Sequence, residues 1–132
     1  MPYVIDVFVS PVRDNPVAHV AITLVFILII LDVIFGIINA VLSHTFSSEK
    51  MRQGIAHKSA EVGFVLVGVL ADAALLGGFD ELGFNAPALL AICAYICVME
   101  LGSLLETFAV MNPALADTPF FKILDSVHIK EG

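Results

Sequence analysis

Five carboxyl side chains stand inside long apolar stretches of this sequence, where an ionisable group is costly. They are Asp32, Glu61, Asp72, Glu100 and Glu106, and the stretches that contain them hold no Lys or Arg. An acid at the centre of a bilayer costs about 2.5–3.5 kcal/mol on insertion scales, so such side chains are expected to face a protein interior or a water-filled cavity. Two interpretations stay open: the acids only hydrogen-bond helices together in their protonated form, or some of them line a conduit and control its opening.

Three of these acids are predicted to lie at similar depths on three different helices. At about 1.5 Å per residue, Asp32, Asp72 and Glu100 each lie about 18–21 Å from one end of their apolar stretch. With no base in these stretches to pair with, most of them should be protonated in a closed assembly, because ionising several neighbouring carboxyls is costly. They are our candidate pore and gating residues, together with Glu61 and Glu106.

The other residue types that could do chemistry form no recognisable site. Cys93 and Cys97 are four apart on one predicted helix, where they cannot easily bridge each other, so we interpret them as packing residues. The histidines have no metal-ligand spacing and are scattered at His19, His44, His57 and His128. A pH-sensing role for His44 or His57 is the alternative. We therefore expect no catalytic residues, no metal, no cofactor and no enzymatic activity.

The composition is that of an integral membrane protein. Apolar residues make up 59% of the 132 residues and charged residues 14%, against roughly 45–50% and about 25% in soluble domains. A soluble domain of this length has too little interior to bury so many apolar side chains. Six Lys and Arg against thirteen Asp and Glu also leave no basic surface for nucleic acid.

Three apolar stretches are long enough to serve as transmembrane helices. Spanning roughly 30 Å of hydrocarbon takes about 20 residues in a helix. The sequence predicts a single all-α membrane domain over residues 1–132, with spans near residues 17–43, 59–78 and 87–111. Asn15 and Pro16 are predicted to start the first span, Asn85 to cap the third, and Asn112 to end it.

Two flanking segments are apolar on one side and too short to span. Thr118 and Pro119 are predicted to begin a C-terminal amphipathic helix at about residues 119–129. Its apolar face has the i, i+3, i+4, i+7 spacing and consists of Phe120, Ile123, Leu124 and Val127. We interpret it as a helix on the membrane surface, or one that docks on a partner. The N-terminal residues 3–9 are also expected at the interface.

The charges of the connectors predict the orientation. The connector before the second span holds Lys50, Arg52 and Lys58, which are half of the basic residues. The next connector holds Asp80 and Glu81 and no base. Since Lys and Arg favour the cytoplasmic side, we expect the N-terminus outside and the C-terminus inside.

Small residues on the polar faces predict close contacts between helices, including contacts between copies of the chain. Gly36 and Ala40 form a small-xxx-small pattern, and Gly63 and Gly68 lie near the polar stripe of the second span. Small residues let helix backbones approach closely in lipid. With Ser103, they are our candidates for helix packing and homo-oligomerisation.

Several of these residues fall into short blocks in a fixed order. The blocks are LDVIFGIINA with Asp32, Gly36 and Ala40; SSEKMRQGIAHK with Ser47, Ser48, Gly54 and Lys58; the later Asp72; MELGSLLET with Glu100, Ser103 and Glu106; and DTPFFKIL. From about Leu31 to Leu124 this order resembles the small phage-lysis and toxin-secretion holin family.

The resemblance implies a non-enzymatic protein that oligomerises in the bacterial cytoplasmic membrane and permeabilises it. Its partners would be the lipid bilayer and other copies of the same chain. A wall-degrading enzyme or an exported toxin would benefit from the lesion without binding to the protein.

Two other functions fit the residues alone. The mid-depth carboxyls are compatible with a small selective channel or a proton-coupled transport component. The C-terminal amphipathic segment is compatible with a structural membrane protein that docks on a partner. Ion-specific conductance would favour the channel, whereas leakage of molecules regardless of charge would favour the holin.

Overall fold

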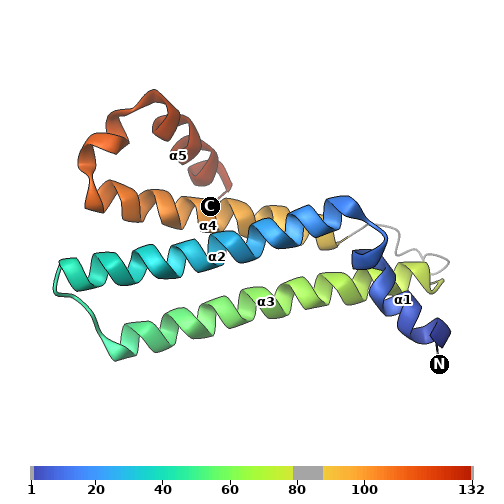
Figure 1. Ribbon diagram of the computed structural model, residues 1–132. Helices are drawn as coiled ribbons and strands as arrows, with labels where there is room; N and C mark the ends of the chain where they lie inside the picture. The colour runs from blue at the N-terminus through green and yellow to red at the C-terminus, as the bar shows by residue number, and fades with distance from the viewer. Residues whose placement is uncertain (1, 79–87, 132) are drawn as a thin grey trace.

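The computed structural model describes residues 2–78 and 88–131, and every regular element in these ranges is a helix (Figure 1). In chain order the elements are α1 (Pro2–Arg13), α2 (Pro16–Leu42), α3 (Ser48–Leu76), α4 (Leu89–Met111), the 3₁₀ helix η2 (Pro113–Asp117) and α5 (Pro119–Glu131). The prediction of an all-α protein with a short C-terminal helix is confirmed.

Three of the helices are long and apolar enough to cross a membrane, namely α2, α3 and α4. They contain 27, 29 and 23 residues, and a span needs about 20. The three transmembrane helices expected from hydropathy are therefore present.

Local polar side chains set the helix ends. The Asn15 side chain accepts hydrogen bonds from the backbone N–H groups of Val17 and Ala18 at 3.0 and 3.3 Å, and Pro16 follows as the first residue of α2. Asn112 ends α4, and its side chain accepts a hydrogen bond from Ala114 N at the start of η2. Asn85, the predicted cap of the third span, lies outside the described residues.

The second long helix begins well before the apolar stretch around which it was predicted. α3 starts at Ser48, and the Ser47 hydroxyl accepts a hydrogen bond from Lys50 N at 3.4 Å as its N-cap. Hydropathy marks where a helix becomes apolar, whereas an N-cap marks where the backbone becomes helical. Most of the segment predicted as a connector is therefore helical, and Lys58 belongs to α3.

The three long helices run side by side with α4 in contact with both others (Figure 1). α2 and α3 both pack along α4 and make only slight contact with each other. The shared core contains Ala18, Val25 and Ile29 of α2, Val65 of α3, and Leu89, Cys93 and Ile96 of α4. The placement of Cys93 agrees with its interpretation as a packing residue.

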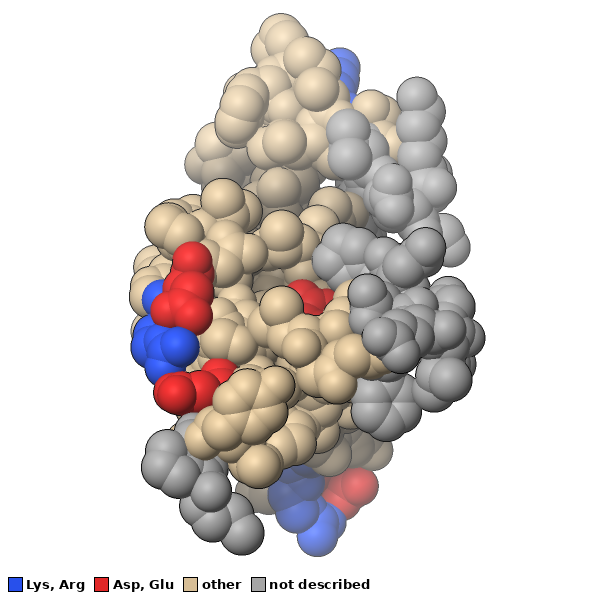
Figure 2. Space-filling view, turned by 90° about the vertical axis from the view of Figure 1, so that its right-hand side faces the viewer, with Lys and Arg blue, Asp and Glu red and all other residues tan. Residues whose placement is uncertain are grey.

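Most large apolar side chains of the long helices face outward. Val20, Leu66 and Val110 are exposed, as are many of their neighbours. Figure 2 shows charged side chains in small separate groups on a largely uncharged surface. Such a surface suits contact with lipid tails or with other apolar helices.

The two short terminal helices pack against the long ones. α1 contacts α3 and α2, and Arg13 at its end pairs with Asp6 and Asp14, each at 2.8 Å. The Arg13 guanidinium lowers the pKa of the Asp14 carboxyl. α5 folds back against α4 (Figure 1). The apolar side chains of Phe120 and Ile123 on α5 stay exposed.

Candidate functional site

One lysine connects all three long helices. The Lys58 Nζ atom of α3 lies 2.7 Å from Oδ2 of Asp32 on α2 and 2.6 Å from Oε1 of Glu100 on α4. The side chains of Lys58, Asp32 and Glu100 are only 15%, 12% and 2% exposed. A buried ion pair of this kind needs close geometry to offset the loss of hydration. Here the lysine links α3 to both α2 and α4.

The expectation that the buried acids have no base to pair with is wrong. It rested on placing Lys58 in an exposed connector, and the early start of α3 moves this residue into the bundle. The lysine therefore belongs to the same buried site as Asp32 and Glu100. A lysine at such a depth is stable only with partners of opposite charge.

Ser103 extends the site by one turn of α4. Its hydroxyl donates a hydrogen bond to Oδ1 of Asp32 at 2.7 Å. Asp32 thus contacts Ser103 through one oxygen and Lys58 through the other. Ser103, predicted as a packing residue, joins α2 to α4 within one chain.

A third carboxyl, Glu61, lies beside this pair on α3. Its side chain is 8% exposed, with Oε2 3.8 Å from Lys58 Nζ and Oε1 3.1 Å from Nε2 of the half-exposed His57. Neither oxygen has a hydrogen-bond partner. Burial without hydrogen bonds is unfavourable for a carboxylate, so Glu61 is the least satisfied group of the site.

We call Asp32, Lys58, Glu61 and Glu100 the buried charge cluster. With every group ionised it carries three negative charges and one positive charge, and its charge is −2. Uncompensated charge in a low-dielectric interior is strongly unfavourable. The cluster therefore favours additional protons or a bound cation, and it would gain from the arrival of water.

Asp72 does not join the other acids. It lies about 21 Å from Lys58 along α3, and its Oδ1 accepts hydrogen bonds from the backbone N–H groups of Ala88 and Leu89 at 2.7 and 3.3 Å. Ala88 is the N-cap of α4 and has no capping side chain of its own. Asp72 caps α4 from the neighbouring helix, where a negative charge also complements the helix dipole. Glu106, the last of the five acids, is exposed on α4.

The small residues serve different purposes. A Cβ on Gly68 would lie 3.0 Å from Leu89 Cα, so this glycine permits the close packing of α3 on α4 within the chain. A Cβ on Gly36 or on Gly63 would meet nothing within 4 Å. Gly36 and Gly63 therefore have open space beside the backbone, as does Gly54.

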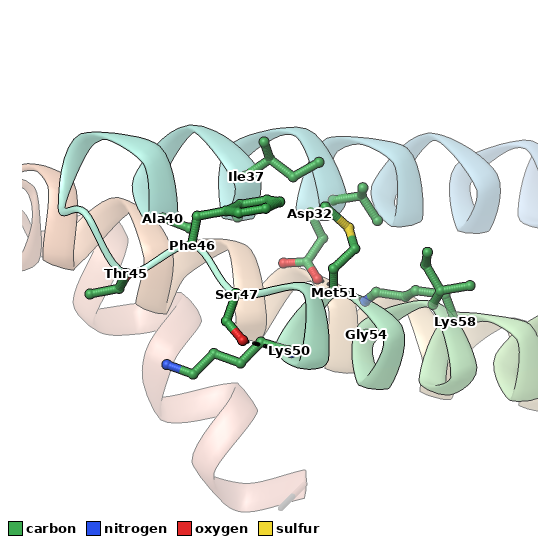
Figure 3. Close-up of a pocket in the computed structure, with 13 residues that line it drawn as sticks. Asp32, Ile37, Ala40, Thr45, Phe46, Ser47, Lys50, Met51, Gly54 and Lys58 are labelled. Carbon is green, nitrogen blue, oxygen red and sulfur yellow. Dashed lines mark hydrogen bonds and ion pairs between the residues drawn. The ribbon is translucent and has the colours of Figure 1, made fainter.

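A groove of about 270 Å³ separates the later half of α2 from the first half of α3. Its lining includes Gly36, Ala40, Phe46, Met51, Gly54 and Ile55. Asp32 and Lys58 point toward each other at one end of it, whereas Lys50 points away from them (Figure 3). Their ion pair crosses the groove where α2 and α3 have little other contact.

The family model of bacteriophage holins matches residues 17–119. The chain belongs to the bacteriophage holin family. Neither the curated proteins nor the solved structures contain a match. Together with its three apolar helices, this membership makes the chain a holin-type, multi-pass protein of the cytoplasmic membrane.

The matched region of the holin contains the whole buried charge cluster and the groove. It runs from the start of α2 to the first residue of α5, so α1 lies outside it. The connector residues of the holin resemblance are also placed: Ser47 caps α3, Ser48 begins it, Gly54 lines the groove and Lys58 enters the cluster.

Sequence reasoning missed two members of the site, Lys58 as a buried base and His57 as a neighbour of Glu61. A signal for both was present, because His57 and Glu61 are four residues apart and Lys58 and Glu61 are three apart. On a helix these spacings place side chains on one face. The signal becomes visible only when residues 48–58 are treated as helix.

Proposed function

We propose that this holin permeabilises the bacterial cytoplasmic membrane as a homo-oligomer, allowing a wall-degrading enzyme or an exported protein to cross. We further propose that the buried charge cluster holds the closed form. The observation that carries this proposal is the position of Lys58, which pairs with α2 and α4 from α3 while α2 and α3 otherwise hardly touch.

The energetics of the cluster support a role in opening. Attraction between charges is strong in a low-dielectric interior, so the Lys58 bridge resists separation of the helices while the site is dry. Once water reaches the groove, it hydrates both partners and also relieves the excess negative charge. Hydration therefore has two effects at once: it weakens the bridge, and it stabilises the separated helices. The change from the closed to the open form should then be abrupt.

The proposed contact between copies uses the faces around Gly36 and Gly63. Both glycines have open space beside the backbone, and Gly36 and Ala40 line the groove. In lipid, helix association depends on close van der Waals packing at small residues. Gly68 is not part of this proposed surface, because α4 already covers it.

The proposed orientation keeps the N-terminus outside and the C-terminus inside. Lys50 and Arg52 remain exposed near the turn between α2 and α3, and exposed bases next to a span favour the cytoplasm. Lys58 no longer counts toward this argument, because it is paired inside the bundle. In this orientation the cluster lies nearer the cytoplasmic end of α3.

The decisive experiment is inducible expression in bacteria, with membrane potential and uptake of an impermeant dye recorded together. The parent should depolarise the cells and admit dye regardless of the charge of the dye. Lys58→Met and Asp32→Asn should permeabilise earlier at matched protein levels, because each removes one side of the bridge across the groove. Glu100→Gln should also shift the onset.

The matched control is Lys122→Gln, which removes an exposed lysine of α5 and should leave the onset unchanged. If all three cluster variants permeabilise the membrane at the same time as the parent, the cluster does not control opening. Ion-selective current without dye uptake would instead contradict permeabilisation and favour a selective channel.

A further inference from the structure

The charge cluster has a second side, which faces away from the groove. His57 and Glu61 lie one turn apart on α3, and Glu100 reaches the same point from α4. One ligand atom from each of the three side chains lies within 4.8 Å of the others. An imidazole nitrogen and two carboxylate oxygens thus converge from two helices.

The state of Glu61 is an independent indication of a ligand at this point. Its side chain is 92% buried by area, since 8% is exposed, and neither carboxylate oxygen accepts a hydrogen bond. It faces His57 Nε2 at 3.1 Å. A buried carboxylate that accepts no hydrogen bond gains from a proton or a cation that offsets its lost hydration, and the imidazole beside Glu61 can share a cation with it.

We propose that His57, Glu61 and Glu100 bind a divalent transition-metal ion of the Zn²⁺ type. One imidazole and two carboxylates are a ligand set that Zn²⁺ accepts, with a fourth position left for water. Mg²⁺ and Ca²⁺ prefer six or more oxygen ligands, and an imidazole suits them poorly. The histidine ligand would therefore favour Zn²⁺ over Mg²⁺ and Ca²⁺.

The charge balance agrees with a divalent ion. The buried charge cluster carries −2 when ionised, and a divalent cation neutralises it. Lys58 Nζ contacts both Glu100 oxygens, and its positive charge would repel the ion if it kept both contacts. It retains Asp32 at 2.7 Å on the groove side, so a Glu100 oxygen can turn to the metal while Lys58 stays paired.

The site is accessible from outside the bundle. His57 is 58% exposed, and a groove between α3 and α4 reaches the site past His57, Ala60, Phe64, Tyr95 and Met99. His57 lies about 14 Å from the start of α3, which is the end nearest the polar turn. An ion would therefore approach from the side of His57 and not through the core shared by α2 and α4.

Bound metal would fasten α3 to α4 at the level of the Lys58 bridge. A ligand that binds only the folded form stabilises it in proportion to its occupancy. Zn²⁺ should therefore raise the melting temperature of the protein. This inference concerns binding and stability, so it holds or fails independently of permeabilisation.

The test uses the full untagged chain in detergent micelles. All variants carry Cys93→Ala and Cys97→Ala, because thiolates on α4 would themselves bind Zn²⁺. Titration calorimetry with ZnCl₂ should give one ion per chain, and the helical circular dichroism signal should melt at a higher temperature with Zn²⁺ but not with MgCl₂. Co²⁺ should give a visible spectrum without a thiolate charge-transfer band.

The decisive comparison is between His57→Gln and His19→Gln. His57→Gln changes an exposed side chain and should weaken Zn²⁺ binding at least tenfold, as should Glu61→Gln. His19→Gln removes an exposed histidine of α2 and should bind as the parent does. Equal Zn²⁺ affinity in His57→Gln and the parent, or no binding by the parent, overturns the proposal. If Glu61→Gln loses its helical signal, His57→Gln alone decides.

Discussion

Lys58 and Asp32 face each other across the groove between α2 and α3, with Nζ 2.7 Å from Oδ2. The two helices make little other contact, so this pair is their main polar connection. Both side chains are largely buried, and hydration is the principal influence that can weaken their attraction. The pair is therefore a strong candidate for the point at which the bundle separates.

A double-mutant cycle on this pair should reveal strong coupling. Lys58→Met alone should lower the free energy of unfolding by about 3–5 kcal/mol, since it leaves buried carboxylates without their base. Asp32→Asn alone should lower it by less, because Lys58 keeps Glu100 as a partner. The double variant should lose much less than the sum of the two. The measurement is denaturant unfolding in micelles, and simple additivity would show that the two residues do not interact.

Asp72 should stabilise the start of α4 as a cap from another helix. Asp72→Ala should lower the free energy of unfolding by about 0.5–2 kcal/mol, because two backbone N–H groups lose their acceptor. Asp72→Asn should lose less, since an amide oxygen can still accept. Asp117→Ala, at an exposed acid of η2, is the control. Equal stability of Asp72→Ala and this control would rule out the capping role.

Two glycines on α3 should respond in opposite ways to alanine. Gly68→Ala should destabilise the protein by about 1–3 kcal/mol, because its Cβ would press on the Leu89 backbone. Gly54→Ala should stabilise it by about 0.5–1 kcal/mol, because the Cβ meets open space and alanine favours helix. Melting temperatures of the two variants in the same detergent test this pair. A stable Gly68→Ala would mean that α3 and α4 are less tightly packed.

The proposed contact between copies can be tested at Gly36. Gly36→Leu should reduce the ladder of oligomers obtained by chemical cross-linking in membranes, because a large side chain would hold the neighbouring backbone away. Ala94→Leu adds the same side chain at an exposed position of α4 and should leave the ladder intact. A ladder unaffected by Gly36→Leu would place the interface elsewhere.

The orientation can be tested with single cysteines in a cysteine-free background. A cysteine in place of Ser48, the first residue of α3, should react with an impermeant thiol reagent only after the cell membrane is disrupted. A cysteine at Gly83, which lies outside the described residues, should react in intact cells. Labelling of position 48 from outside would reverse the proposed topology.

The parts of this fold that could be predicted depend on local signals. Apolar length identified three spans, and Asn15 and Asn112 identified two helix ends, because capping acts through the side chain of the residue itself. The start of α3 could not be placed by hydropathy, since the segment from Ser48 to Lys58 is polar and still helical. A polar sequence with a serine N-cap can form a helix without an apolar face.

Which residues form the site depends on how each helix is rotated about its own axis, and not only on how far along the helix a residue lies. Asp72 and Glu100 appeared equivalent along their helices, yet Asp72 caps α4 whereas Glu100 meets Lys58. Which residues meet is set by how α3 and α4 turn toward each other, and the Gly68–Leu89 contact helps to fix that rotation. Such a contact between distant residues leaves no periodic signal in the sequence.

The Asp32–Lys58 pair belongs to two consecutive helices, and this has a consequence for biogenesis. During synthesis α2 and α3 emerge before α4, so Lys58 would enter the membrane before Glu100 exists. Insertion of an unaccompanied lysine is costly, but α2 already carries Asp32 as its counter-ion. The first two spans can therefore insert as a hairpin in which Lys58 is already paired with Asp32. The later insertion of α4 adds Glu100 and completes the site.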